Sequence, residues 1–263
     1  MRFEVRGNEV YASTGGRDHK EGQPYLILMH GAGASHLLWT QQSRSFAYAG
    51  YNVLAVDFPG HNLSAGEPLA TVEDQADWLI EVMDALGIEK AVFVGHSQGG
   101  LVALSMADKV PDRVEKIAFV ATAAAIPVND MLISTAEAKE PRAKSSMTAW
   151  GLGPDAHHFD NTVPGFSHAG MGLRIMDLNP DGAVANDLKA CATFEGGLDI
   201  AKSIKCPTMC VLARKDKMTP VKFGQKLAEA LPDNVLHIVD SGHTIPSERP
   251  HELNEYLRAF LAA

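Results

Sequence analysis

The stretch 91-AVFVGHSQGGLVALSMADKV-110 joins an apolar run to an amphipathic one through a polar, glycine-rich junction. The apolar run is typical of a buried strand, and the residues after Gln98 have the apolar spacing of a helix. Ser97 lies at the junction, between Gly95 and Gly99. The stretch therefore predicts a strand, a tight turn and a helix, with a serine that is either a chemical reagent or only a helix cap.

Five further apolar runs lack the polar alternation of a half-exposed strand, which indicates strands buried on both faces of a parallel sheet. These runs lie at residues 25–29, 51–57, 114–121, 208–213 and 234–239. A hairpin with its turn at Gly7 and Asn8 precedes them and adds two strands. The clearest helical pattern between strands begins after Thr71, a suitable N-cap, and ends at Gly87. The alternation predicts a doubly wound α/β fold with a mostly parallel, eight-stranded sheet.

The segment from residue 126 to residue 200 contains no run that resembles a buried strand. Its stretches 128–140, 171–178 and 181–194 have helical spacing and are separated by loops with proline and glycine. A segment of this size with so few large apolar residues would form only a thin core alone. We therefore expect a core of residues 1–125 and 201–263, and a helical cap of residues 126–200 inserted over one end of the sheet.

Composition limits the classes of partner. The chain has 263 residues, 46% of them hydrophobic, and a formal net charge of −9 with no cluster of lysine or arginine. This balance argues against nucleic acid and anionic membranes, and no apolar run is long enough for a membrane helix or a signal peptide. We expect a cytoplasmic protein that binds a small-molecule substrate and needs neither metal nor cofactor. The oligomeric state stays open.

The cysteines give no sign of a disulfide framework or a zinc site. Cys191, Cys206 and Cys210 are odd in number, and no matching set of histidine or cysteine accompanies them. We expect reduced and partly buried thiols at these positions.

Polar clusters follow four of the predicted strands. They read 30-HGAGAS-35, 95-GHSQGG-100, 214-RKDKMTP-220 and 240-DSGHTIPSERP-250. Because ligands of an open parallel sheet bind beyond the carboxyl ends of its strands, we expect these clusters to share one site. They carry a serine, an acid and a histidine in that chain order: Ser97, Asp216 and His243.

With these motifs the chain resembles the α/β-hydrolase family over residues 1–125 and 201–263. The resemblance rests on GHSQG as the G-x-S-x-G nucleophile elbow, HGAG as the oxyanion loop, Asp216 followed by Pro220, and His243 in G-H-x-x-x-x-E-x-P. It implies that Ser97 is the nucleophile and His243 the base and then the acid. Asp216 would hold the tautomer of His243 and stabilise its imidazolium.

The resemblance also implies an oxyanion hole made of the backbone N–H groups of Ala32 and Gln98, with Gly33 as the alternative to Ala32. His30 is expected to brace this loop. The loop 57-DFPGHNLSAG-66 resembles a further family segment, with Asn62 in place of a glycine. Asp57 and Ser64 within that loop are expected to be structural.

Several residues have two interpretations. Asp240 lies only three residues before His243 and competes with Asp216, which we favour because it ends a different strand and precedes Pro220. The pair His157 and His158 is expected to be a solvated loop and not a metal site. One group of cap residues could line an apolar pocket or form the core of the cap itself: Met131, Met147, Trp150, Phe159, Phe166, Met171 and Met176.

A serine at the elbow argues against the haloalkane dehalogenases and epoxide hydrolases of the family, which have aspartate there. The leading hypothesis is hydrolysis of a small carboxylic ester, lactone or thioester through an acyl-enzyme. A carbon–carbon bond hydrolase of ring-cleavage products is the alternative, since HGAGAS and Trp39 resemble that subfamily while TIPSE after His243 lacks its tryptophan. A non-catalytic small-molecule binding protein on the same fold is the third possibility.

Overall fold

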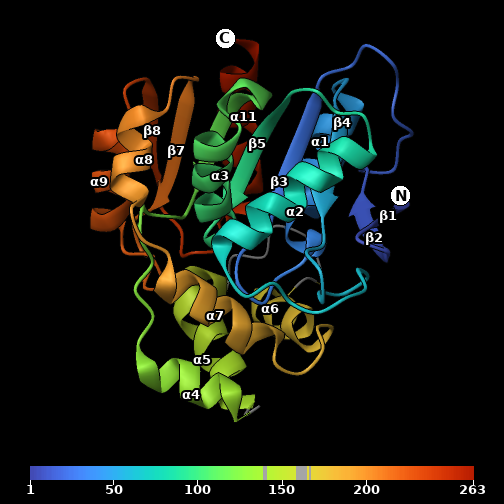
Figure 1. Ribbon diagram of the computed structural model, residues 1–263. Coiled ribbons are helices and arrows are strands. Elements are labelled where there is room, and N and C mark those ends of the chain that lie inside the picture. The colour runs from blue at the N-terminus through green and yellow to red at the C-terminus, as the bar shows by residue number, and fades with distance from the viewer. Residues whose placement is uncertain (139–140, 158–164, 166) are drawn as a thin grey trace.

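The computed structural model describes residues 1–138, 141–157, 165 and 167–263. Its centre is a sheet of eight strands in the order β1-β2-β4-β3-β5-β6-β7-β8. The strands from β4 to β8 in this order run parallel, whereas β2 is antiparallel to both of its neighbours. The predicted eight-stranded, mostly parallel sheet is therefore confirmed (Figure 1). The strands are β1 (Arg2–Val5), β2 (Asn8–Ser13), β3 (Tyr25–Met29), β4 (Asn52–Val56), β5 (Ala91–His96), β6 (Val114–Val120), β7 (Thr208–Ala213) and β8 (Asn234–Val239).

The opening hairpin is present, but its turn lies one residue earlier than predicted. Arg6 and Gly7 both have positive φ, of 53° and 72°, and Asn8 is already paired with Val5 in the ladder. A two-residue turn with two positive φ values matches the right-handed twist of the strands that it joins. Gly7 was thus correctly placed in the turn, and Asn8 was wrongly assigned to it.

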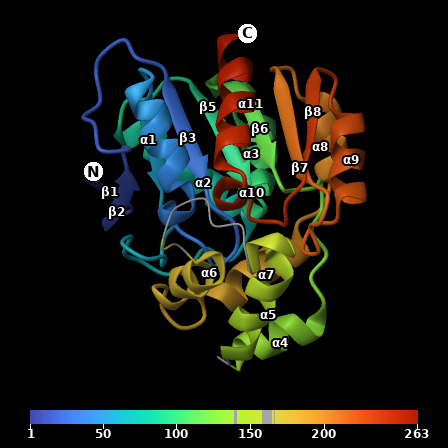
Figure 2. The same cartoon turned by 180° about the vertical axis from the view of Figure 1, so that it is seen from behind.

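Helices cover both faces of the sheet. Alternate residues of a strand point to opposite faces, and in β3 to β7 both sets are mostly apolar and buried. One face packs against α2 (Val72–Ala85), α3 (Gln98–Lys109), α8 (Gly197–Ser203) and α9 (Val221–Ala230), and Figure 1 shows α2 and α3 in front of the sheet. The other packs against α1 (Thr40–Tyr48), α10 (Ile245–Glu248) and α11 (Pro250–Ala262), in front of it in Figure 2.

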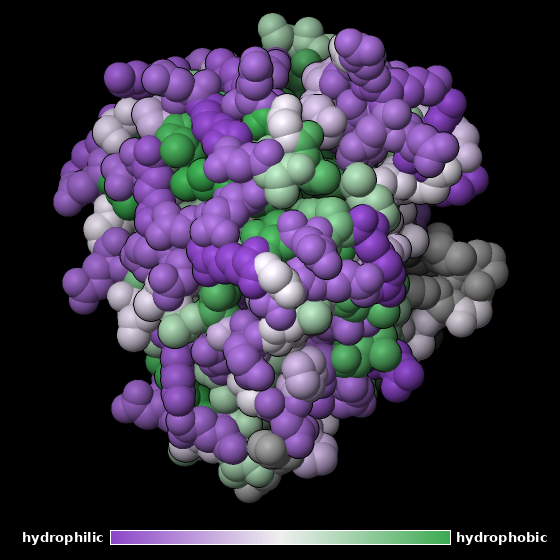
Figure 3. All heavy atoms as spheres, turned by 45° about the vertical axis from the view of Figure 1, so that its right-hand side comes forward, coloured by the Kyte–Doolittle hydropathy of each residue, from purple (hydrophilic) through white to green (hydrophobic). Residues whose placement is uncertain are grey.

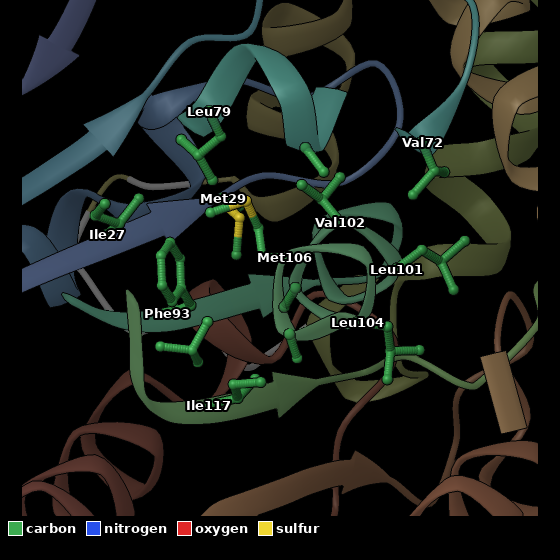
Figure 4. Packing of buried hydrophobic residues seen from close by; sticks show 14 of the residues in the cluster. Ile27, Met29, Val72, Leu79, Phe93, Leu101, Val102, Leu104, Met106 and Ile117 are labelled. Carbon is green, nitrogen blue, oxygen red and sulfur yellow. The ribbon is translucent and has the colours of Figure 1, made fainter. Parts of the chain in front are cut away.

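The first of these two interfaces is the larger core. Figure 4 shows Met29 of β3 and Phe93 of β5 gathered with Leu79 of α2 and Met106 of α3. Burial of such side chains is worth roughly 1.5–3 kcal/mol each, so this layer fixes the position of α3 on the sheet. The start of α3 is therefore held firmly at the carboxyl end of β5.

The helix predicted between Thr71 and Gly87 is confirmed as α2. Thr71 Oγ1 accepts a hydrogen bond from the backbone N–H of Asp74 at 3.0 Å. Glu73 and Asp74 lie in the first turn, where the positive end of the helix dipole favours negative charge. Gly87, with φ of 64°, ends the helix as the C-cap pattern predicts.

The helices α4 (Asp130–Glu137), α5 (Pro141–Gly151), α6 (His168–Asp177) and α7 (Ala183–Thr193) gather beyond one end of the sheet (Figures 1 and 2). They share a small apolar cluster that includes Leu132, Met147 and Leu188. The end of α7 and all of α8 pack instead on the main core, against the α3 side of the sheet. The division into a core of residues 1–125 and 201–263 and a cap of residues 126–200 stays a prediction.

Three short 3-10 helices complete the described elements: η1 (His36–Trp39), η2 (Pro111–Arg113) and η3 (Asp155–His157). Polar residues dominate the face in Figure 3, and its apolar residues form small, separate patches. Across the described part of the chain, no helix combines the length and the apolar character needed to cross a membrane.

Candidate active site

The turn between β5 and α3 places Ser97 in a strained backbone conformation, with φ of 52° and ψ of −119°. The glycines around it are required by close backbone contacts. A Cβ added at Gly95 would lie 2.2 Å from the carbonyl oxygen of Gly99, and one added at Gly99 would lie 2.5 Å from that of Met29. The Ser97 side chain makes no capping hydrogen bond to the described residues of α3, so the helix-cap interpretation does not account for this serine.

His243 and Asp216 form a buried hydrogen-bonded pair. His243 Nδ1 lies 2.8 Å from Asp216 Oδ2, and Asp216 Oδ1 accepts from the backbone N–H groups of Met218 and Thr219, each at 2.8 Å. Burial alone would raise the pKa of Asp216, but the charge of His243 and hydrogen bonds from His243 and Thr219 hold that pKa below 3.8. Asp216 is therefore an anion that can orient the ring of His243.

The competing acid, Asp240, has a different partner. Asp240 Oδ2 lies 3.1 Å from Lys215 Nζ, and both side chains are partly exposed. Of the two candidates, only Asp216 contacts the His243 ring in the described structure.

The loop that carries His243 is tied down by Glu248, the glutamate of the G-H-x-x-x-x-E motif. Glu248 Oε2 accepts from the N–H groups of Gly242 and Gly153, each at 3.0 Å. The N–H of His243 itself donates to the carbonyl oxygen of Gly151 at 2.6 Å. Gly151 ends α5 and Gly153 follows it, so α5 and the loop fix the histidine together.

His96, the residue before Ser97 in the elbow, contacts His243. Its Nε2 lies 3.0 Å from the carbonyl oxygen of His243, and the two ring centroids are 4.6 Å apart. A carbonyl can only accept, so His96 Nε2 carries the proton. Burial, followed by repulsion from His243, lowers the pKa of His96 to about 3. His96 is therefore a neutral donor beneath the site.

The proposed oxyanion loop passes directly over the elbow. A Cβ added at Gly31 would lie 2.9 Å from the Cβ of Ser97. Gly33, the alternative donor, has its N–H already donated to Asp187 Oδ2 at 2.8 Å. No hydrogen bond within the described part of the chain uses the N–H of Ala32 or of Gln98. Between the two loop candidates, this geometry favours Ala32.

His30 contacts the oxyanion loop, as expected for a brace. Its Nδ1 lies 2.9 Å from the carbonyl oxygen of Gly31, and its Nε2 accepts from the N–H of Phe58 at 3.3 Å. One nitrogen donates and the other accepts, so the ring is neutral. Burial, followed by repulsion from His61, lowers the pKa of His30 to about 4.

The elbow, the loop and the histidine open into one cavity of about 690 Å³. Its walls include Ser97, His243 and Ala32, and apolar side chains of α4, α5 and α6. The volume is within the range of small-molecule sites, which are mostly apolar with a few placed polar groups.

The apolar residues predicted either to line a pocket or to form a core among the helices divide between these two roles. The residues Met147, Trp150, Met171 and Met176 line the cavity, and two of these, Met147 and Met176, also belong to the apolar cluster shared by α4 to α7. Met131 does neither and is 77% exposed. Phe159, Phe166 and His158 lie outside the described residues, as does the side chain of His157.

The cysteines contain no disulfide: Cys191, Cys206 and Cys210 are all free thiols. Cys191 is buried in the wall of the cavity, and burial raises the pKa of its thiol. It is thus a poor nucleophile at neutral pH.

Two residues of α7 and of the loop before it, which no sequence pattern indicated, contact the proposed oxyanion loop. Asp187 of α7 bonds Gly33 and lies 2.8 Å from His61 Nε2. Asn179, between α6 and α7, donates to the carbonyl oxygen of Gly33 at 2.7 Å. Only the position of His61 in the loop that resembles a family segment could have drawn attention to this group.

Comparison with known proteins agrees with this architecture. The model of the alpha/beta hydrolase family matches residues 26–256. The 3-oxoadipate enol-lactonase 1 of Acinetobacter baylyi is 26% identical over 246 residues, which cover 92% of this chain and 90% of that protein. The 2-hydroxy-6-oxononadienedioate/2-hydroxy-6-oxononatrienedioate hydrolase of Pseudomonas sp is 25% identical over 284 residues, 99% of this chain and 95% of that protein.

Among solved structures, the enol-lactonase from Burkholderia xenovorans LB400 has a TM-score of 0.90 at 23% identity, with both chains covered completely. A thermophilic esterase from Thermogutta terrifontis has a TM-score of 0.85 at 22% identity and covers 100% of this chain and 98% of its own. These structures share the fold, and the family model matches most of the sequence. The chain therefore belongs to the alpha/beta hydrolase family.

Proposed function

We propose that the protein is a serine hydrolase that cleaves a small carboxylic ester, lactone or thioester through an acyl-enzyme intermediate. The observation that carries the proposal is the geometry around Ser97. This serine has positive φ, is not used as a helix cap, and lies in the same cavity as His243, whose Nδ1 is bonded to Asp216. These are the features of a serine held as a nucleophile beside a base.

The first half of the reaction transfers the acyl group to the enzyme. Because His243 Nδ1 donates to Asp216, Nε2 is the nitrogen that can accept a proton. Ser97 Oγ forms a bond to the substrate carbonyl carbon as its proton passes to His243 Nε2. The bond from that carbon to the leaving oxygen or sulfur then breaks, and the leaving group takes the proton from His243.

The second half returns the enzyme to its first state. Water adds to the acyl carbon and gives its proton to His243 Nε2. The carbon–oxygen bond to Ser97 breaks, Ser97 regains the proton, and the carboxylic acid leaves. In both halves the carbonyl oxygen becomes negatively charged, and the N–H groups of Ala32 and Gln98 would stabilise it. Each such donor is worth about 10²–10³ in rate.

The substrate range follows from the cavity and from the relatives. A mostly apolar cavity of about 690 Å³ suits a small molecule. A curated relative and a structural relative are both described as enol-lactonases, and another structural relative as an esterase. This likeness supports esters and lactones as the first substrates to test.

The proposal is tested with short-chain p-nitrophenyl esters and simple lactones, using Ser97→Ala as the matched control. We expect turnover of at least one of these substrates and a loss of at least about 10³-fold in kcat in the variant. Equal, slow rates for the two proteins would favour the non-catalytic binding protein on this fold.

Carbon–carbon bond hydrolysis is the second candidate, because a relative of similar identity is described as a 2-hydroxy-6-oxononadienedioate/2-hydroxy-6-oxononatrienedioate hydrolase. Trp39, part of the sequence likeness to that subfamily, is fully buried, with its ring 6.4 Å from that of His96. Trp39 is part of the packed core next to the elbow, so its presence gives no information on the substrate. Consumption of a dienol ring-fission product, without turnover of any ester or lactone, would reverse the order of the two candidates.

A further inference from the structure

A buried ion pair lies beside the oxyanion loop and takes no part in the mechanism above. His61 and Asp187 are both almost completely buried, and His61 Nε2 lies 2.8 Å from Asp187 Oδ2. The other nitrogen, His61 Nδ1, lies 3.0 Å from the carbonyl oxygen of Pro59. Both ring nitrogens thus face acceptors, so both carry protons and the ring is an imidazolium.

The neighbouring histidine, His30, is neutral, whereas His61 is protonated. The ring of His30, 5.1 Å from that of His61, is neutral because its Nε2 accepts from a backbone N–H. Burial would lower the pKa of His61, but the charge and hydrogen bond of Asp187, aided by Asp57, raise it above 6.5. Burial likewise opposes ionisation of Asp187, and His61 together with the Gly33 N–H lowers its pKa below 3.8. The pair is therefore charged at neutral pH.

The same carboxylate oxygen also holds the oxyanion loop. Asp187 Oδ2 accepts from the Gly33 N–H at 2.8 Å, so one oxygen serves both Gly33 and His61. Asn179 Nδ2 donates to the carbonyl oxygens of Gly33 at 2.7 Å and of Ala34 at 3.3 Å. Both peptide groups of Gly33 are thereby bonded to residues of the inserted segment.

Packing adds to these bonds. Gly33 has φ of 65°, and a Cβ added there would lie 2.9 Å from Cγ2 of Val184 in α7. Ala32 is the residue before Gly33, so the direction of its N–H depends on where the Gly33 peptide is held. If these contacts were lost, Ser97 and His243 would stay in place, but the N–H of Ala32 would no longer be directed at the oxyanion.

We propose that Asp187, with its partner His61 and with Asn179, is a positioning residue that sets the oxyanion loop from the cap. This inference rests on the proposed function, since it concerns the donor Ala32 in that reaction. It makes the inserted segment a part of the transition-state machinery, in addition to the wall of the substrate cavity.

The test is Asp187→Asn, which keeps the size of the side chain. An amide has one oxygen and one nitrogen in place of the carboxylate, and only an oxygen can accept from both Gly33 and a protonated His61. A neutral His61 that keeps its Nδ1–H bond to Pro59 turns the lone pair of Nε2 towards the amide nitrogen, and the Gly33 N–H then loses its acceptor. We expect kcat for a p-nitrophenyl ester to fall at least tenfold, with KM changed less than threefold.

Asp177→Asn is the matched control, because Asp177 is a partly exposed cap carboxylate that pairs with Lys144. Its kcat and KM should equal those of the wild type. Asn179→Ala is the second variant, since it releases the loop without leaving a charge buried. Rates of labelling by a fluorophosphonate should fall in parallel with kcat in both loop variants, while circular dichroism shows a folded chain.

The outcomes separate the two proposals. Failure of the wild type to react with the fluorophosphonate would count against the proposed function itself. A reactive wild type, with both loop variants folded and at wild-type kcat and labelling rate, would overturn the positioning role alone. A rise in KM with unchanged kcat in these variants would overturn it as well, because it would make the group a substrate contact.

Discussion

Replacing Ser97 with glycine is expected to give a more stable protein than replacing it with alanine, although both variants lose the nucleophile. The backbone at Ser97, with φ of 52° and ψ of −119°, is in a region that costs a residue with a Cβ about 1–3 kcal/mol. Glycine removes that strain. It also raises the conformational entropy of the unfolded chain, which lowers the free energy of unfolding by about 0.4–1 kcal/mol. The net gain of glycine over alanine is about 1 kcal/mol, or about 2 °C in Tm for a chain of this size.

The measurement is the free energy of unfolding of Ser97→Ala and Ser97→Gly by urea titration at one pH. The alanine variant is the reference because it loses the same hydroxyl and keeps the Cβ. Ala259→Gly, at an exposed position in α11, controls for glycine in an ordinary helix and should lose about 0.5–1 kcal/mol. A Ser97→Gly variant less stable than Ser97→Ala by that same amount would refute the argument that the elbow stores backbone strain.

Three further predictions concern the acid, the buried histidines and the glycines of the elbow. Asp216→Asn should lower kcat about 10⁴-fold in steady-state assays while the chain stays folded, because the amide selects the wrong histidine tautomer. The pKa values of about 4 for His30 and about 3 for His96 lie below the ordinary 6.5, so only the unfolded chain binds these protons at mildly acid pH. The stability that comes from keeping these two histidines neutral is fully present above pH 6.5. The free energy of unfolding should therefore fall by about 2.7 kcal/mol per pH unit from about pH 6 to 4.5 in urea titrations. Gly95→Ala should fail to give a native circular dichroism spectrum, because its Cβ would lie 2.2 Å from the carbonyl oxygen of Gly99.

Each of these three has a contrary result. An Asp216→Asn enzyme within tenfold of the wild type would remove the acid from the mechanism. A slope below about 1 kcal/mol per pH unit would mean that at least one of the two histidines accepts a proton in the folded chain. A native and active Gly95→Ala protein would show that the turn has more room than its contacts indicate.

The sheet could be predicted because its strands are buried on both faces, which leaves uninterrupted apolar runs. In β3 and β5, for example, almost every residue is buried, and both strands were found within a residue of their ends. The helix α5 was not predicted. Its sequence 141-PRAKSSMTAWG-151 is largely polar, and only Ala143, Met147 and Gly151 in it are buried. Contacts with α4 and α6 stabilise it, and the local sequence carries little of that information.

Part of the candidate site could likewise be predicted from the sequence, and part could not. Motifs with fixed spacing next to strand ends identified Ser97, Asp216 and His243 as neighbours in space, since parallel strands end at one edge of a sheet. No such pattern indicated the pair of His61 and Asp187, because the two residues are 126 positions apart and the second lies in α7, where no motif marks it. Only the folded chain brings that carboxylate to the oxyanion loop.

The central claim is that Ser97 is the nucleophile and that His243 activates it. Its most direct test is incubation of the folded protein with a fluorophosphonate, followed by peptide mass spectrometry. We predict one covalent adduct, on Ser97, that forms in the wild type, is absent in Ser97→Ala and forms far more slowly in His243→Ala. An unlabelled Ser97 in the folded wild-type protein, or labelling that does not depend on His243, would contradict the claim.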